Sequence, residues 1–130
     1  MKAIVLSSGG VDSTTCLAMA VHELGKENVV TLSFEYGQRH CKELESAQKV
    51  ADYYGVRHVV FNLTQIFSFS NCSLLSNSTE KPVHESYAEQ ISKNGEGKVS
   101  TYVPFRNGLM LSAGAALAQS LFPEEKCEIW

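Results

Sequence analysis

The chain lacks an excess of cations and lacks a long apolar run, and each absence excludes a class of partner. Its net charge is −3, and nucleic-acid binding depends on clustered lysine and arginine, so we expect no direct nucleic-acid partner. The N-terminal apolar run ends at Ser7, which makes it too short for a secretory signal or a membrane-spanning helix. The sequence therefore predicts a cytoplasmic protein without a membrane partner.

Closely spaced cysteines are also missing. The four cysteines lie at positions 16, 41, 72 and 127, and none of them forms the C-x-x-C spacing typical of a zinc site. A disulfide framework is not expected in the cytosol. We expect isolated thiols and no zinc ligands in this chain. A length of 130 residues with 44% hydrophobic and 19% charged residues is typical of one globular domain.

Two common phosphate-binding patterns are absent as well. The sequence contains neither the Walker pattern GxxxxGK[ST] nor the dinucleotide pattern GxGxxG. What it does contain is LSSGGVDSTT at residues 6–15, directly after the apolar residues 3–6. Two glycines, several hydroxyls and one carboxylate thus stand where an opening strand turns into a helix.

Hydrophobic periodicity predicts alternating strands and helices. The expected strands are 2–7, 28–34 and 58–63, and the expected helices are 13–24 and 41–54. Buried strands that alternate with amphipathic helices predict an α/β fold, a Rossmann-like parallel sheet with helices on both faces. Residues 64–99 show little periodicity and form a variable loop. A last helix is expected at about 108–121, capped by Asn107, and residues 127–130 resemble the first part of a further strand that is truncated.

The strand-to-helix turn suits a phosphate group. Gly9 and Gly10 lack Cβ atoms, so the backbone can approach a ligand closely, and the first amides of a helix have no partner within it. Asp12 would repel phosphates unless it orients a Mg²⁺ ion that neutralises their charge. We therefore predict that Asp12 takes part in Mg²⁺ binding indirectly. A plain glycine turn with a capping side chain is the structural alternative. The predicted nucleotide-binding residues are Ser7, Ser8, Gly9, Gly10, Val11, Asp12, Ser13, Thr14, Thr15, Cys16 and Leu17.

The segment SGGVDS, Ser8 to Ser13, resembles the PP-loop of the N-type ATP pyrophosphatases. This superfamily includes asparagine, GMP and NAD synthetases and tRNA-modifying enzymes. The resemblance implies an adenine nucleotide alpha hydrolase-like fold that binds ATP and cleaves it between the α- and β-phosphates. An acceptor oxygen is then adenylated and displaced by nitrogen or sulfur.

Two further segments narrow the resemblance. FEYGQRH at residues 34–40 and STYVPFRN at residues 100–107 follow the loop in that order, and the three together look like the 7-cyano-7-deazaguanine (preQ0) synthase family of queuosine and archaeosine biosynthesis. The resemblance implies conversion of 7-carboxy-7-deazaguanine and ammonia to the nitrile with ATP. Another PP-loop enzyme, amide-forming or tRNA-thiolating, and a non-catalytic nucleotide-binding module remain as alternatives.

The same resemblance guides the choice of catalytic residues. We assign catalysis to Asp12, Arg39, His40 and Arg106. The two arginines are the natural cations for a phosphate or a substrate carboxylate, because guanidinium binds both in a bidentate way. His40 is a candidate for substrate recognition or proton transfer.

This chain departs from the family in two respects. Phe105 stands where the family has a small residue, often glycine, before Arg-Asn. Family members also continue for roughly another half of their length and hold a structural Zn²⁺ with a C-terminal cysteine cluster, which this chain lacks. We therefore describe residues 1–130 as a PP-loop ATP-binding α/β domain without the zinc-binding part. By resemblance, the full protein is a homodimer.

Overall fold

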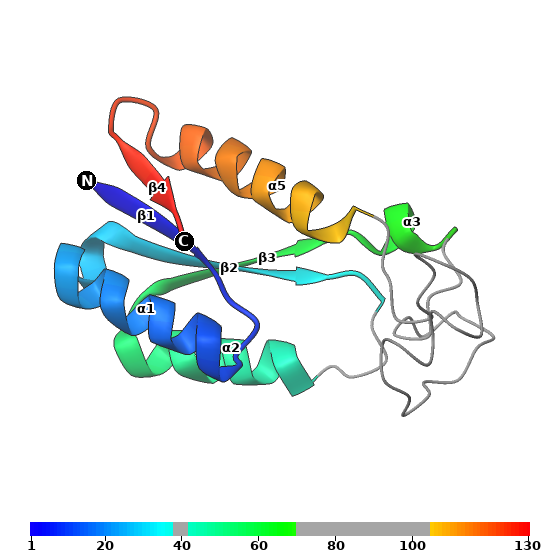
Figure 1. Ribbon diagram of the computed structural model, residues 1–130, viewed down its shortest axis with the longest axis horizontal. Helices are drawn as coiled ribbons and strands as arrows, with labels where there is room; N and C mark the ends of the chain where they lie inside the picture. Colours follow the sequence, from blue (N-terminus) through cyan, green and yellow to red (C-terminus); the bar gives the residue numbers. More distant parts are fainter. Residues whose placement is uncertain (38–41, 70–104) are drawn as a thin grey trace, which may run out of the picture.

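The computed structural model describes residues 1–37, 42–69 and 105–130, which form one twisted parallel sheet flanked by helices (Figure 1). The strands are β1 (Lys2–Leu6), β2 (Val29–Glu35), β3 (Arg57–Asn62) and β4 (Cys127–Ile129), in the spatial order β3-β2-β1-β4. All three pairings are parallel. The predicted parallel α/β sheet is therefore confirmed, with the first strand in the interior.

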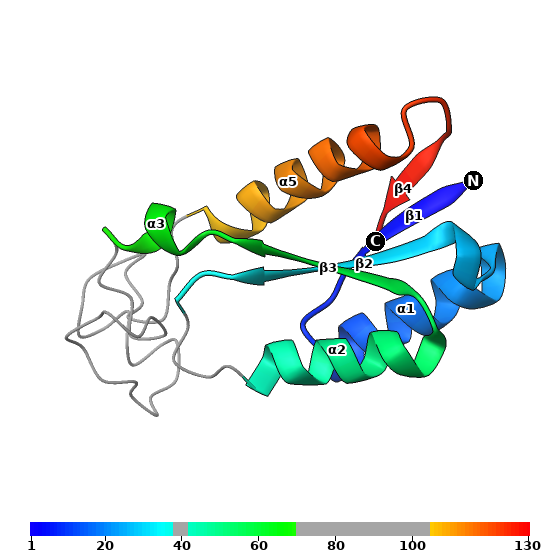
Figure 2. The same cartoon turned by 180° about the vertical axis from the view of Figure 1, so that it is seen from behind.

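Helices cover both faces of this sheet, as predicted. They are α1 (Val11–Leu24), η1 (Lys26–Asn28), α2 (Lys42–Tyr54), α3 (Thr64–Phe67) and α5 (Arg106–Leu121). Helices α1 and α2 lie on one face and α5 on the other, which Figures 1 and 2 show from opposite sides. The start of α5 lies at the carboxyl edge of the sheet, where β2 and β3 end.

Two hydrophobic clusters hold these layers together. One joins the α1 and α2 face to the sheet through Val5, Leu17 and Ala51, all fully buried. The other lies under α5 and contains Ile4 and Leu32. Strand β2 is buried along its whole length except for its last residue, as expected for an interior strand covered on both faces.

Three local expectations need correction. Helix α1 begins at Val11 rather than at residue 13, because Gly10 already has the extended conformation of an N-cap. Helix α5 begins at Arg106 with Phe105 at the N-cap, so Asn107 lies within the first turn and does not cap it. Helix α3 was not predicted, because four residues are too few to show periodicity. Most of the predicted variable loop lies outside the described residues.

No helix in the described part of the chain is both long enough and apolar enough to cross a membrane.

Candidate functional site: the loop after the first strand

The loop that follows β1 is anchored from both neighbouring strands. The amide of Leu6 donates to the carbonyl oxygen of Trp130, beyond β4, at 3.0 Å, and the amide of Ser7 donates to Leu32 in β2 at 2.9 Å. The Ser33 hydroxyl donates to the Ser7 carbonyl oxygen at 2.5 Å. The base of the loop is therefore fixed by the interior of the sheet.

Within the loop, serine hydroxyls hold the turn together. The amide of Ser8 donates to Ser13 Oγ at 3.2 Å, and the two serine hydroxyls lie 3.2 Å apart. Ser13 Oγ donates to the Gly10 carbonyl oxygen, and the Gly10 amide donates to Ser8 Oγ, each at 3.3 Å. These contacts close the turn over residues 8–13 and leave Ser8, Gly10 and Asp12 exposed to solvent.

Gly9 shows why the turn requires a glycine. Its φ is +79°, a left-handed conformation that side chains disfavour. A Cβ there would lie 2.6 Å from the Ala47 amide nitrogen and 2.6 Å from Ser46 Cβ. The loop thus rests directly on the backbone of α2, and the predicted close approach at this glycine is made to a helix of the same protein.

The start of α1 presents free amides at this turn. The first helical hydrogen bond runs from the Thr14 amide to the Gly10 carbonyl oxygen at 3.0 Å, so the amides of the three preceding residues have no acceptor within the helix. No side chain caps this helix. Among the described residues, the start of α1 is therefore open to an anion, which the helix dipole also favours.

One buried hydroxyl at the loop lacks a partner. Ser7 is only 6% exposed, and its Oγ has no hydrogen-bond partner among the described residues. Buried polar atoms are normally satisfied. Ser7 is thus an available hydrogen-bonding group at the base of the loop.

The predicted nucleotide-binding residues divide into two groups. Ser7 to Ser13 form the loop and the first turn of α1, and Thr14 is half-buried behind them. Thr15 turns its hydroxyl back to the Val11 carbonyl oxygen at 2.8 Å, Cys16 is half-buried, and Leu17 is fully buried in the core. The structure therefore brings the first group together at the turn and places the Leu17 side chain away from solvent.

A second group of side chains meets on the α5 face of the sheet. Arg106 Nη1 donates to the Tyr36 hydroxyl at 3.2 Å, and its guanidinium carbon lies 5.8 Å from the centre of the Tyr36 ring. Sequence reasoning selected Arg106 but missed Tyr36, although Tyr36 stands inside the FEYGQRH segment. The predicted catalytic residues Arg39 and His40 lie outside the described residues.

Phe105, next to Arg106, is unusual in both conformation and contact. Its φ is +51°, in the left-handed region, which is strained for a bulky residue. Its ring lies over Gly108, where a Cβ would come within 2.4 Å of the ring. The glycine at 108 therefore makes room for the phenylalanine that replaces the small residue expected at 105.

Ion pairs and clusters of metal-binding side chains are scarce in the part of the chain that the structure describes. The described residues contain one ion pair, between Lys2 and Glu125 at 3.8 Å, and no group of three or more histidine, cysteine or acidic side chains that could hold a metal ion. Burial lowers the pKa of His58, and burial is also the main cause that raises the pKa of Cys127. Neither residue belongs to the loop.

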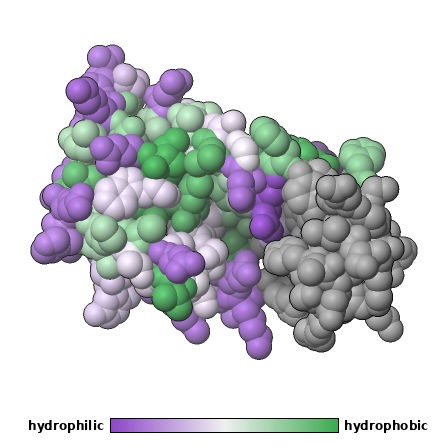
Figure 3. Space-filling view, in the orientation of Figure 1, coloured by the Kyte–Doolittle hydropathy of each residue, from purple (hydrophilic) through white to green (hydrophobic). Residues whose placement is uncertain are grey.

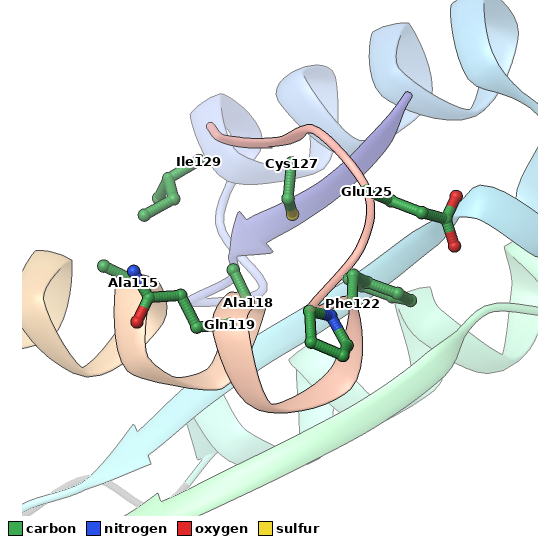
Figure 4. A pocket seen from close by; sticks show the side chains of 8 residues that line it. Ala115, Ala118, Gln119, Phe122, Glu125, Cys127 and Ile129 are labelled. Atoms are coloured by element: carbon green, nitrogen blue, oxygen red, sulfur yellow. The ribbon is translucent and has the colours of Figure 1, made fainter.

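A cavity of about 230 Å³ lies elsewhere, between α5 and β4 (Figure 4). It is lined by Ala115, Ala118, Gln119, Phe122, Pro123, Glu125, Cys127 and Ile129. Figure 3 shows a hydrophobic area between α5 and the ends of β1 and β4. None of the predicted site residues lines this cavity.

Two solved structures share the fold of this chain. An NH3-dependent NAD synthetase from Campylobacter jejuni, solved in complex with the nitrate ion, matches 92% of this chain and 43% of its own at a TM-score of 0.60 and 15% identity. A glutamine-dependent NAD+ synthetase from Acinetobacter baumannii, in complex with ADP, matches 92% of this chain and 20% of its own. The TM-score is 0.63 and the sequence identity is 21%. These likenesses show that the chain has the α/β fold of the two synthetases.

Sequence comparison gives the family. The model of the queuosine biosynthesis protein QueC matches residues 2–125, so the chain belongs to this family. Two proteins named 7-cyano-7-deazaguanine synthase are similar. The one from Oceanobacillus iheyensis is 40% identical over 127 residues, 95% of this chain and 52% of that protein. The one from Thermoplasma acidophilum is 43% identical over 122 residues, which are 92% of this chain and 47% of that protein. The chain thus spans about half the length of these relatives.

Proposed function

We propose that this chain provides the ATP-binding part of an ATP-dependent carbon–nitrogen ligase that converts 7-carboxy-7-deazaguanine and ammonia to 7-cyano-7-deazaguanine. The observation that supports this most directly is the loop after β1. It combines a left-handed Gly9, a start of α1 that no side chain caps, and a buried Ser7 hydroxyl that has no hydrogen-bond partner within the described residues. The names of the two relatives give the product, 7-cyano-7-deazaguanine, and the resemblance of the sequence motifs to the family suggests the substrates.

The loop fits the phosphates of ATP. The free amides at the start of α1 can donate to phosphate oxygens, as helix N-termini commonly do. The exposed Ser8 hydroxyl and the Ser7 hydroxyl add further groups at the same turn. Because the phosphates would lie against fixed donors, the loop holds them in place while the acceptor is adenylated.

Asp12 fits an indirect role with Mg²⁺. It is exposed in the first turn of α1, and Mg²⁺ usually binds one or two carboxylates together with waters and substrate phosphates. A single carboxylate beside a phosphate site meets that requirement. When bound, Mg²⁺ would neutralise phosphate charge, and Asp12 would orient it.

The reaction requires activation of a poor electrophile. A carboxylate oxygen of the substrate attacks the α-phosphorus of ATP and pyrophosphate leaves, which gives a mixed anhydride. Ammonia displaces AMP and loses a proton, which gives the amide. The amide oxygen then attacks the α-phosphorus of a second ATP and pyrophosphate leaves. The oxygen departs as part of a second AMP while the nitrogen loses its two protons, which gives the nitrile. We assign Arg106 to the anionic groups of the reactants, together with Arg39 and His40.

A direct assay tests the proposal. The protein encoded by the complete gene is incubated with 7-carboxy-7-deazaguanine, ATP, Mg²⁺ and ammonia, and the product is identified by mass spectrometry. We expect the nitrile together with AMP and pyrophosphate. Absence of the nitrile would overturn the proposal: ATP cleavage with other acceptors would favour another PP-loop enzyme, and ATP binding without cleavage a non-catalytic module.

The resemblance also carries proposals for the complete protein. We propose that it binds one structural Zn²⁺ outside this chain, is a homodimer and works in the cytoplasm. The described residues offer no zinc cluster. Metal analysis and light scattering of the complete protein test the first two, and microscopy of a tagged protein tests the third.

A further inference from the structure

Arg106 and Tyr36 come from segments 70 residues apart and meet at the carboxyl edge of the sheet. Tyr36 directly follows β2, and Arg106 is the first residue of α5. Figure 1 shows the start of α5 at the end of the sheet where the arrowheads of β2 and β3 lie. The loop after β1 leaves the same edge, because parallel strands end on one side.

Tyr36 is itself held firmly. It is 8% exposed, and its ring makes an edge-to-face contact with Phe67 of α3, which is 4% exposed, at 5.9 Å between ring centres. Such aromatic pairs prefer defined ring orientations and stabilise the protein beyond the area that they bury. The Tyr36 hydroxyl is therefore a fixed acceptor at the end of β2.

Arg106 contacts Tyr36, and no described carboxylate compensates its charge. Within residues 1–37, 42–69 and 105–130, its polar contact is the Tyr36 hydroxyl, and the ion pair found there, Lys2 with Glu125, does not involve it. A guanidinium carries five N–H donors in one plane, so the contact with Tyr36 leaves most of them available as far as the described residues are concerned. A half-buried, oriented cation without a carboxylate partner is suited to bind an anion.

We propose that Tyr36 is a positioning residue that orients the Arg106 guanidinium toward the carboxylate of the substrate. This role rests on the proposed function. The hydrogen bond fixes the plane of the guanidinium, and the contact with the Tyr36 ring restricts the rotation of the Arg106 side chain. Oriented in this way, Arg106 binds the flat carboxylate without losing further side-chain freedom, which is the usual benefit of preorganisation.

The test uses Tyr36→Phe in the protein encoded by the complete gene. This change removes the acceptor hydroxyl but keeps the ring and its contact with Phe67. We expect the KM for 7-carboxy-7-deazaguanine to rise about three- to tenfold, within the typical net contribution of one hydrogen bond, while the KM for ATP stays unchanged. A merely structural loss would lower the active fraction and leave both KM values unchanged. Tyr53→Phe, the same chemical change on exposed α2, is the matched control.

A second measurement asks whether Tyr36 acts through Arg106. The dissociation constant of the substrate is measured by calorimetry, with and without Tyr36→Phe, in wild-type and Arg106→Met proteins. We expect the weakening to appear in the wild-type background and to vanish when the arginine is absent. If the wild-type protein makes the nitrile but Tyr36→Phe has no effect, or the same effect in both backgrounds, the positioning role is wrong. If the wild-type protein makes no nitrile, the proposed function itself fails.

Discussion

At the scale of single residues, the two adjacent glycines of the loop have different tasks. Gly9 has a left-handed backbone and no space for a side chain, whereas Gly10 has a φ of −80° and its nearest obstacle is Ser8 Oγ at 3.3 Å. The first glycine is required by the contact with α2. The second is an ordinary extended residue at a helix start.

Alanine at each glycine should therefore give unequal results. We expect Gly9→Ala to lower the free energy of unfolding by about 2–4 kcal/mol, from left-handed strain and overlap with backbone atoms. Gly10→Ala should cost less than about 1 kcal/mol, as for an N-cap change. Urea unfolding of both variants measures this, and equal losses would contradict the contact with α2.

Asp12 offers a residue-scale test of metal binding. We expect Asp12→Ala to reduce turnover at least about a hundredfold, as expected when a group that stabilises transition-state charge is removed. The free energy of unfolding should change by less than about 1 kcal/mol, because the side chain is exposed and interacts mainly with the helix dipole. Turnover at saturating Mg²⁺ and thermal unfolding are measured together. Unchanged turnover would rule out the metal role.

At the scale of elements, β3 carries a titratable side chain, His58, that contacts a side chain of its neighbour β2. His58 Nδ1 lies 2.7 Å from Thr31 Oγ1, its Nε2 is buried without a partner among the described residues, and Thr31 is fully buried. Burial lowers the pKa of His58, while the negative charge of Asp52 on α2 opposes this to a smaller extent. The folded protein therefore favours neutral histidine at this point.

This pairing predicts a pH dependence of stability. Because the pKa of His58 is lower in the folded state than its ordinary value of 6.5, the unfolded state binds the proton more readily. The stabilisation is present above the unfolded pKa and declines as the pH falls below it. We expect the free energy of unfolding to decrease between pH of about 7.5 and about 5, and to decrease less in His58→Gln. Equal slopes in both proteins would show that His58 does not contribute.

Elements were predictable where a pattern repeats over several turns. The strand and helix alternation and the position of the loop followed from periodicity and from the two glycines. Helix α3 and the start of α5 at Arg106 did not, since four residues show no period and a left-handed Phe105 is an unexpected N-cap. Local patterns also gave no sign of Tyr36 meeting Arg106, because only the folded sheet brings these segments together.

At the scale of the whole molecule, the chain carries a net charge of −3 yet is proposed to bind an anion. Attraction must then come from a few fixed groups at the loop, and not from a broad positive field. Because these fixed groups, the glycines and hydroxyls, lie in one short segment, the sequence alone could indicate the binding edge of the sheet.

This distinction predicts a weak salt dependence. We expect the dissociation constant for ATP with Mg²⁺ to rise less than about threefold between about 50 and about 200 mM NaCl, because short contacts with amides are little screened. Calorimetry at several salt concentrations measures it. A rise of tenfold or more, by the slope expected for clustered cations, would indicate a basic surface instead of the loop.

The contact between Gly9 and the backbone of α2 has a practical consequence for protein engineering. The ten residues from Leu6 to Thr15 are not a portable peptide, because their turn is complete only when a helix lies against the glycine. A transplant into another scaffold would have to carry β1, α1 and α2 as one unit. Libraries that randomise Ser46 or Ala47 would in turn change the shape of this loop, although both residues lie more than thirty positions after it in the sequence.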